Sequence, residues 1–371
     1  MILILTQCLP PDPGGIEVLV GGLATALAGS GEEVLVLADR IRGKGLAEPV
    51  WPKGVTVRRF GGPKPLRRLA KGFAARRLLA RAGVQAVVTD TWKSAALLPN
   101  QAGVPVLVLA HGNEVLPVAS ARRVARRRDA FARATVVAAN SAYTAALVRE
   151  ALGNAAPRVE IVPLPLPAPL DATPEATAWA ASLAEGASPV IASLSRLEPR
   201  KGIDQVIRAL PALAVTHSAI RFLVAGSGPD RARLEALAAS EGVADRVRFL
   251  GRIDEAQKAA LLARADLFVM PARREGNSVE GFGIVYLEAA WQGCPSLAGR
   301  EGGAAEAVAD GETGLLCDGA DAKAVAAALD RLLADPVRLK AMGEAAAARV
   351  RAEFLWQHAL PRYRALLGLK A

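Results

Sequence analysis

The stretch Pro189-Val-Ile-Ala-Ser-Leu-Ser-Arg-Leu-Glu-Pro-Arg-Lys-Gly-Ile-Asp-Gln-Val-Ile-Arg-Ala-Leu-Pro-Ala-Leu213 joins an apolar run to a helical pattern through a charged loop. The run Pro189–Ser193 predicts a buried strand, and Ile203–Leu213 predicts a helix. The alternation continues with the expected strands Arg221–Ala225, Val247–Leu250, Asp266–Met270 and Pro295–Ala298 and the expected helices Asp230–Ala239, Glu255–Ala263 and Ile284–Gln292. Strands that alternate with helices indicate a parallel sheet, so we expect a doubly wound α/β domain here.

The first half of the chain alternates in the same way. Its clearest helices are Ile16–Ala28 and Leu66–Ala82, and its expected strands are Ile2–Thr6, Glu33–Ala38, Val55–Phe60, Gln85–Thr89, Val104–Ala110, Thr135–Ala139 and Val159–Pro163. Several strands are continuous Val, Leu and Ile runs, which is typical of strands covered on both faces. The chain has 371 residues. Since single cores stop growing near roughly 250–300 residues, two domains are expected.

A proline-rich segment separates the two halves. Residues Pro163–Pro174 contain five prolines in twelve positions, and such a segment continues neither a helix nor a central strand. We interpret it as the interdomain linker, which gives domains over residues 1–165 and 166–350. The tail Pro336–Leu369 is expected to form two or three helices, with Pro361 kinking or restarting the last one.

Composition disfavours several kinds of site. Three cysteines and three histidines lie far apart without metal or redox spacing, and no Asp-x-Asp pair occurs, so neither a metal nor another cofactor is expected. The cysteines are expected to be buried in a reducing cytoplasm. The apolar N-terminus, Met1–Thr6, lacks the features of a signal peptide. No run approaches the roughly 20 apolar residues of a membrane span, so we expect a soluble or peripheral protein.

The positive charge is concentrated in the first half. Residues 1–170 contain 22 Lys and Arg against 11 Asp and Glu, whereas the remainder contains 24 against 25. The segment Leu66–Arg81 fits an amphipathic helix, and a second basic cluster spans Arg122–Arg128. The residues expected on this basic surface are Arg67, Arg68, Lys71, Arg76, Arg77, Arg81, Arg122, Arg123, Arg126 and Arg127. Such a surface favours an anionic membrane, although a merely solvated helix fits as well. Nucleic acid is not expected, because interleaved aromatic residues and known motifs are missing.

Charged and glycine-rich loops follow the strands of the second half, where doubly wound sheets bind ligands. Arg196 and Lys201 flank one such loop. A forked donor and a point cation suit a diphosphate, but solvated surface charge would look the same. The pattern Gly226-Ser-Gly-Pro229 is interpreted as a structural turn.

The strongest signal is Glu280-Gly-Phe-Gly-Ile-Val-Tyr-Leu-Glu288. Glu280 stands just before the expected helix, and Glu288 lies about one turn inside it. The glycines leave exposed amides at a helix N-terminus, which favours an anion. The two carboxylates either accept hydrogen bonds from sugar hydroxyls or only interact with the helix dipole, and the spacing leaves both possibilities open.

Three loops of the first half are also candidates. Gly14 and Gly15 open a helix, where free amides favour an anion, or else form a simple turn. His111 follows the strand Val104–Ala110 and is expected to face the ligand side of the sheet, although a lone histidine is often structural. Ser141 or Asn140 is expected to cap the next helix.

Together these motifs resemble one family. Gly14-Gly15, the His111 loop, Ser195-Arg-Leu with Lys201-Gly202, Gly226-x-Gly-Pro229 and Glu280-x7-Glu288 occur in the order found in retaining glycosyltransferases of the GT-B fold, family 4, over about residues 1–320. The segment Arg273–Glu288 is similar to the PimB-like branch of phosphatidylinositol mannosyltransferases. The resemblance implies two Rossmann-like domains facing a cleft, a GDP-mannose donor, a lipid or glycan-lipid acceptor, and a tail over residues 351–371 that crosses back to the first domain.

The resemblance also implies a role for each matching residue. Arg196 and Lys201 would hold the diphosphate, and Glu288 the ribose hydroxyls. Glu280 and His111 would contact the transferred sugar, so His111, Glu280, Arg196 and Lys201 are the expected catalytic residues. The other implied donor contacts are Gly14, Gly15, Gly251, Arg252, Ile253, Gly281, Phe282, Gly283, Ile284 and Val285.

The expected reaction is hexose transfer with retention of configuration, by front-face attack without a metal, at the inner face of the plasma membrane. Two alternatives within the enzymes are a UDP-sugar donor and a soluble acceptor such as a sugar phosphate. A sugar-nucleotide-binding protein without catalysis is a further alternative, which the intact candidate residues disfavour.

Overall fold

The computed structural model describes residues 1–43, 45–81, 83–117, 119–167, 171–276 and 278–370. The chain divides into two compact units, one over Met1–Pro167 with Leu355–Ala371 and the other over Ala168–Phe354. Residues 168–170 of the proline-rich segment, and the expected helix end at residue 82, lie outside the described residues.

Unit 1 is built on a seven-stranded sheet with the order β3-β2-β1-β4-β5-β6-β7. All of its strand pairs are parallel, as the repeated strand–helix alternation predicts. Its strands are β1 (Ile2–Leu5), β2 (Val34–Asp39), β3 (Val55–Phe60), β4 (Ala86–Thr89), β5 (Val106–Ala110), β6 (Val136–Ala139) and β7 (Arg158–Ile161). Its helices are α1 (Gly15–Gly29), α2 (Lys64–Leu79), α3 (Trp92–Ala95), α4 (Ala121–Phe131), α5 (Ala142–Leu152) and α14 (Trp356–Leu366), with a 3-10 turn at Gly153–Ala155.

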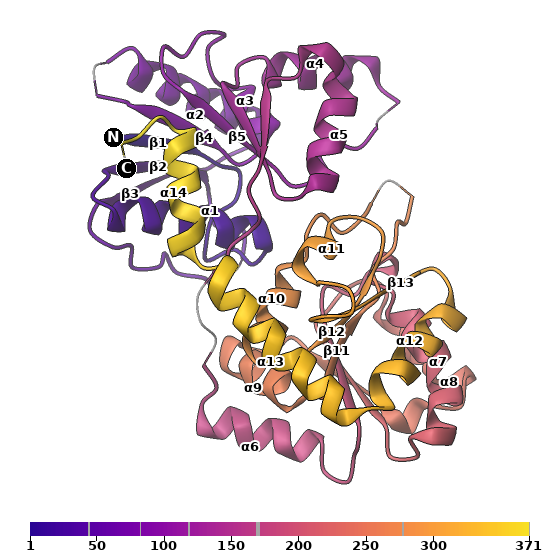
Figure 1. The fold of residues 1–371 in the computed structure, drawn as a ribbon. Helices are drawn as coiled ribbons and strands as arrows, with labels where there is room; N and C mark the ends of the chain where they lie inside the picture. Colours follow the sequence, from indigo (N-terminus) through magenta and orange to yellow (C-terminus); the bar gives the residue numbers. More distant parts are fainter. Residues whose placement is uncertain (44, 82, 118, 168–170, 277, 371) are drawn as a thin grey trace. The chain divides into compact units, whose positions relative to one another are not determined.

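Unit 2 has a six-stranded parallel sheet with the order β10-β9-β8-β11-β12-β13. Its strands are β8 (Val190–Leu194), β9 (Arg221–Ala225), β10 (Val247–Gly251), β11 (Leu267–Met270), β12 (Ser296–Gly299) and β13 (Gly314–Cys317). Its helices are α6 (Pro174–Leu183), α7 (Ile203–Thr216), α8 (Arg231–Ser240), α9 (Glu255–Arg264), α10 (Ile284–Trp291), α11 (Ala304–Ala307), α12 (Ala322–Leu333) and α13 (Pro336–Glu353), with 3-10 turns at Pro199–Lys201 and Ala244–Arg246. Helix α7 packs beside α8 and α12, and α9 beside α6 and α10 (Figure 1).

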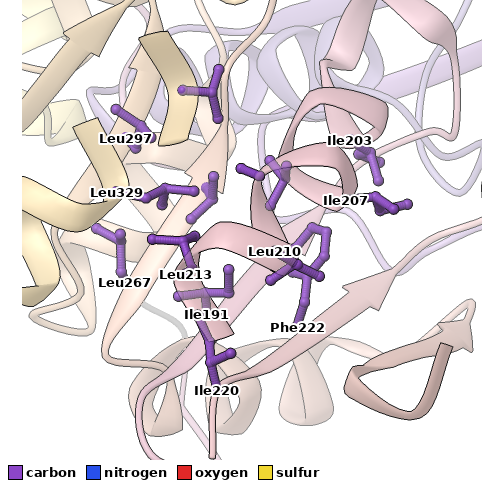
Figure 2. Packing of buried hydrophobic residues seen from close by; sticks show 14 of the residues in the cluster. Ile191, Ile203, Ile207, Leu210, Leu213, Ile220, Phe222, Leu267, Leu297 and Leu329 are labelled. Atoms are coloured by element: carbon purple, nitrogen blue, oxygen red, sulfur yellow. The ribbon is translucent and has the colours of Figure 1, made fainter. Parts of the chain in front are cut away.

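The core of unit 2 lies between its sheet and the α7–α12 layer. Figure 2 shows side chains of α7 meeting those of β8, β9, β11 and β12. Ile207 and Leu210 are fully buried, as are Ile191 and Phe222 on the strands. Each such side chain contributes about 1.5–3 kcal/mol when it leaves water. The predicted doubly wound α/β architecture is confirmed.

The C-terminal tail forms α13 and α14, and α14 packs on α1 of unit 1 (Figure 1). Gly22 of α1 makes this contact possible, because a Cβ at this position would overlap the ring of Trp356. Arg364 of α14 also pairs with Glu32, at 3.1 Å between Nη1 and Oε1. The expected restart at Pro361 is wrong. The helix begins at Trp356 and continues through Pro361, because the break falls earlier, at Phe354 and Leu355.

The expectation that the cysteines are buried holds for two of the three. Cys294 and Cys317 are buried as expected, whereas Cys8 is half-exposed. In the part of the chain that the structure describes, no helix is long and apolar enough to cross a membrane.

Candidate active site

The strand order of unit 2 reverses beside β8, where β9 lies on one side and β11 on the other. In doubly wound sheets, ligands bind outside the carboxyl ends of the strands at such a reversal. The loops after β8 and β11 meet here: the Arg273 backbone N–H donates to the Arg200 carbonyl at 2.9 Å. Gly202 has φ of 73°, and a Cβ there would overlap the Pro271 carbonyl oxygen. Glycine therefore lets the two loops approach closely.

Glu280 and Lys201, which are 79 residues apart, meet at this edge of the sheet. Lys201 Nζ lies 2.5 Å from Glu280 Oε2, and Arg200 Nη1 lies 3.1 Å from the same oxygen. The side chains of Lys201 and Glu280 are only 11% and 14% exposed. Burial raises the pKa of the Glu280 carboxyl, but the charges of Lys201 and Arg200 outweigh burial, so its pKa lies below the usual value.

Arg196 lies on the same loop but does not join this cluster. Its Nε pairs with Glu198 Oε1 at 3.1 Å, and its side chain is 70% exposed. Glu198 also accepts a hydrogen bond from Arg200 Nε at 3.0 Å. The loop thus presents one exposed and two largely buried cations.

Helix α10 begins at Ile284, four residues after Glu280. Its N-cap, Gly283, is left-handed, with φ of 87°, and no side chain caps the helix among the described residues. The Phe282 side chain is only 1% exposed and packs against Phe354 at 6.2 Å between ring centroids. Phe282 therefore offers only its backbone to a ligand. The amides at this N-terminus and the positive end of the helix dipole favour an anion.

Glu288 lies one turn into α10 and is paired with a residue that the sequence did not single out. Lys258 Nζ on α9 lies 2.7 Å from Glu288 Oε1 and 2.7 Å from Glu255 Oε2. Burial raises the pKa of the Glu288 carboxyl, and Lys258 offsets this only in part, so its pKa lies above the usual value. The two glutamates of the motif thus have opposite pKa shifts.

The loop after β9 lies between the loops after β8 and β10 and contacts both. A Cβ at Gly226 or Gly228 would overlap the carbonyl oxygens of Ser195 and Leu197, respectively, so the G-x-G-P turn is required for packing. The Gly226 N–H donates to the Gly251 carbonyl at 2.6 Å, and Arg252 Nε donates to the Ser227 hydroxyl at 3.0 Å. Half-buried Ile253 follows on the same loop.

In unit 1, His111 follows β5 and is held at both its backbone and its ring. Its backbone N–H donates to Glu114 Oε1 at 2.7 Å. Its Nε2 lies 2.8 Å from the Asp90 carbonyl oxygen, which only a protonated nitrogen can satisfy. Nε2 is therefore the donor in this contact.

Asp90, after β4, organises the loop that follows β1. Its Oδ2 accepts hydrogen bonds from the Thr6 hydroxyl at 3.0 Å and the Gln7 N–H at 2.7 Å. Asp90 is only 1% exposed. Ser141 caps α5 as expected, since its hydroxyl accepts from the Thr144 N–H at 3.0 Å.

Gly14 and Gly15 stand at the N-terminus of α1, where Gly14 is the N-cap. The carboxylate of Glu17 turns back to this N-terminus. It lies so close to Gly14 that a Cβ at this position would overlap Glu17 Oε2. Arg42 Nη2 lies 2.7 Å from Glu17 Oε1, and Arg42 Nε lies 3.2 Å from Asp12 Oδ2. A carboxylate therefore already faces the amides where a ligand anion was expected.

Two family models match the chain. The model described as Glycosyltransferase Family 4 matches residues 13–167, and the model described as Glycosyl transferases group 1 matches residues 177–349. The GDP-mannose-dependent alpha-(1-6)-phosphatidylinositol monomannoside mannosyltransferase of Mycolicibacterium smegmatis is 35% identical, over 93% of this chain and 92% of that protein.

This chain is a family 4 glycosyltransferase.

Two further comparisons agree with this assignment. The glycosyltransferase is 34% identical to the D-inositol 3-phosphate glycosyltransferase of Nocardia farcinica, over 69% of this chain and 57% of that protein. The solved structure of sucrose-phosphate synthase from Thermosynechococcus elongatus has a TM-score of 0.81 at 25% identity and covers 99% of both chains. The expected GT-B fold and hexosyltransferase class are thus confirmed.

The structure corrects the expected basic surface of the glycosyltransferase. Lys71 is fully buried, with its Nζ 2.6 Å from Asp39 Oδ1, and Arg127 is only 4% exposed and donates to the Val115 and Leu116 carbonyls. Neither residue is available to a membrane. Arg67 is half-buried and pairs with Asp39 at 2.9 Å. Exposed positions are Arg76, Arg77, Arg81, Arg122, Arg123 and Arg126, and Arg68 is half-buried.

The sequence interpretation missed three residues at the candidate loops: Arg200 and Lys258 in unit 2, and Asp90 in unit 1. Arg200 adjoins Lys201, and Asp90 follows a strand as His111 does. The same criterion that selected Lys201 and His111, a position in a loop after a strand, would also have selected Arg200 and Asp90. Lys258 lies within α9, and its pairing with Glu288 depends on how α9 packs on α10.

Proposed function

We propose that this glycosyltransferase transfers mannose from GDP-mannose to a membrane lipid acceptor that carries a phosphate. The observation that supports it most is the near full-length similarity to a GDP-mannose-dependent phosphatidylinositol monomannoside mannosyltransferase. The clustered cations and uncapped helix N-terminus of unit 2 suit a nucleoside diphosphate, as in other anion sites at helix starts.

Within the proposed donor site, Lys201 and Arg196 neutralise the diphosphate, and the amides of α10 bind its distal phosphate. Lys201 is now paired with Glu280, so donor binding shares this cation between a carboxylate and a phosphate. Glu280 accepts hydrogen bonds from the transferred sugar, and Glu288 accepts them from the ribose through the oxygen that Lys258 does not hold. His111 contacts the sugar near the reaction centre.

The proposed reaction retains the anomeric configuration. The acceptor oxygen forms its bond to the anomeric carbon on the face from which the diphosphate departs, and the acceptor proton passes to the departing phosphate oxygen. Lys201 and Arg196 stabilise the charge that develops on this oxygen. Positioning and charge stabilisation supply the acceleration, and we propose that no metal is required.

The proposed location is the inner face of the plasma membrane, where the enzyme is peripheral. The exposed arginines of α2 and α4 attract anionic lipid, since each basic residue near such a surface contributes about 1 kcal/mol. The exposed Leu66, Leu69 and Phe73 of α2 supply apolar contacts.

Thermal shift with GDP, UDP, ADP and their sugars, in the presence of EDTA, tests the donor. GDP at 100 times its dissociation constant is expected to add about 2.7 kcal/mol of stability. A shift with UDP compounds alone would refute the GDP assignment, and a shift that disappears with EDTA would refute metal independence. Product NMR tests the stereochemistry, where an inverted linkage would refute front-face attack.

A soluble sugar-phosphate acceptor is the second candidate. It is favoured by the similarity to a D-inositol 3-phosphate glycosyltransferase, an enzyme that is named after a soluble sugar-phosphate-like compound. Transfer to water-soluble phosphates at rates equal to those with lipid vesicles would favour this function over the first.

A further inference from the structure

A large groove opens on unit 1 between α2, α3 and α4. Its volume is about 1030 Å³, at the upper end of the roughly 300–1,000 Å³ of ligand pockets. Leu69, Gly72 and Phe73 of α2 line one wall, and Trp92 and Leu97 of the α3 segment line another. These lining residues give the groove an apolar floor.

The apolar side chains of α2 face outward for a structural reason. Helix α2 buries Lys71, Gly72, Ala74 and Ala75. Its larger side chains Leu66, Leu69 and Phe73 are therefore left 63%, 70% and 70% exposed. Three large exposed apolar side chains on one helix indicate a surface that binds an apolar partner.

The rim of the groove is basic. Six of its lining residues are cations, namely Lys64, Arg68, Arg76, Lys93, Arg123 and Arg126, and none of the described lining residues is acidic. None of these six forms an ion pair with a described residue. Burial and the neighbouring charge of Arg126 lower the pKa of Arg68, and the charges of Asp39 and Asp90 offset this only in part. A partner that has both an apolar and an anionic part therefore suits this groove.

The groove is coupled to the His111 loop. Trp92 Nε1, in the groove wall, donates to the Glu114 carbonyl at 3.0 Å. Glu114 in turn accepts from the His111 N–H at 2.7 Å. Trp92 also lies two residues after Asp90, whose carbonyl holds the His111 ring. A molecule bound in the groove therefore lies beside the segment that positions His111.

We propose that this groove binds one acyl chain of the lipid acceptor, with the lipid phosphate held by Arg68, Arg123 and Arg126. This inference rests on the proposed lipid acceptor. It adds that the enzyme draws one acyl chain out of the bilayer, rather than only contacting the membrane surface. The apolar floor solvates the chain, the basic rim binds the phosphate, and the headgroup reaches toward His111.

Calorimetric titration with butyl, hexyl, octyl and decyl phosphate, each below its micelle concentration, tests the groove. Affinity is expected to rise about two- to fourfold per methylene, with inorganic phosphate binding more weakly than all of them. Ala96→Trp, which fills the groove, and Phe73→Ala are expected to flatten this dependence. Leu66→Ala is the matched control, because Leu66 lies on the same helix and is as exposed but does not line the groove. It should keep the dependence.

Arg126→Gln is expected to lower the affinity for every alkyl phosphate by the same factor. Arg122→Gln should leave these affinities unchanged, because Arg122 does not line the groove. Affinity that does not depend on chain length would overturn the inference. If GDP still raises the melting temperature and lipid is still mannosylated in that case, acyl-chain binding by the groove is refuted but the proposed function stands. Chain-length dependence without sugar transfer to any lipid would overturn the proposed function and, with it, the acceptor role of the bound chain.

Discussion

At the scale of single residues, the centre of the candidate site is a balance of charges around Glu280. Lys201 and Arg200 share one of its carboxylate oxygens, while Glu288 is held by Lys258 from a different helix. The sequence predicted both glutamates and Lys201, because each stands in a loop or at a helix start that follows a strand. It did not predict which cation meets which carboxylate, because those pairs are set by tertiary packing.

Lys201→Met is expected to lower kcat by about 10²–10³, because it removes a charge that stabilises the departing diphosphate. Initial rates with saturating GDP-mannose would measure it. Arg231→Gln is the matched control, since Arg231 is a cation of unit 2 that pairs with Glu235 on α8. It should stay within about twofold of the parent enzyme. An equal loss in both variants would contradict the assigned role of Lys201.

As the pH falls, donor affinity is expected to decrease at a higher pH than it would if Glu288 had the ordinary pKa of a glutamate. The pKa of Glu288 is raised, so its carboxylate protonates first as the pH falls, whereas Glu280, with a lowered pKa, stays ionised to lower pH. A protonated Glu288 accepts fewer hydrogen bonds from ribose hydroxyls. GDP titrations between pH 4 and 8 would detect the loss. Glu288→Gln should bind more weakly and lack this pH dependence, and an unchanged profile would exclude Glu288 as its source.

At the scale of elements, periodicity predicted nearly all strands of both sheets, because buried parallel strands are continuous apolar runs. It predicted helix α2 but placed one of its cations on the wrong face. The expected basic surface included Lys71, yet Lys71 is buried against Asp39, whereas Leu69 and Phe73 are exposed, as an amphipathic helix on lipid requires. Asp39 ends a strand 32 residues away, so no local pattern reveals this pair.

The docking of α14 on α1 is expected to depend on Gly22. Gly22→Val should lower the free energy of unfolding by about 1–3 kcal/mol, because its side chain would overlap the Trp356 ring. Denaturant unfolding would measure it. Gly29→Ala on the same helix is the control, since no atom lies within 4 Å of its added Cβ. It should be neutral or stabilising by up to about 1 kcal/mol, and equal destabilisation by both would contradict the packing role.

At the scale of the whole molecule, charge is divided between the halves of the chain. The excess of 11 positive charges falls within residues 1–170, and the remainder has a net charge of −1. This division matches the proposed roles, with unit 1 meeting anionic lipid and unit 2 holding the donor.

Binding to vesicles that contain anionic lipid is expected to weaken as salt rises, because exposed charges are screened within about 10 Å at 0.1 M. Arg77→Gln and Arg122→Gln should each weaken binding about fivefold at low salt. Lys71→Met removes the same charge but should not change binding, because its ammonium is buried. It should instead lower the stability of unit 1. Equal effects of Lys71→Met and Arg77→Gln on vesicle co-sedimentation would contradict this surface.

The sequence by itself determined the doubly wound architecture, the order of the candidate loops and the asymmetry of charge. These properties depend on local periodicity and on composition, which the chain carries in any conformation. Only the tertiary structure decided which residues meet: Glu280 with Lys201 and Arg200, Glu288 with Lys258, Lys71 with Asp39, and the apolar groove with its basic rim. Each of these joins separate elements, so it exists only after the sheets and helices have packed.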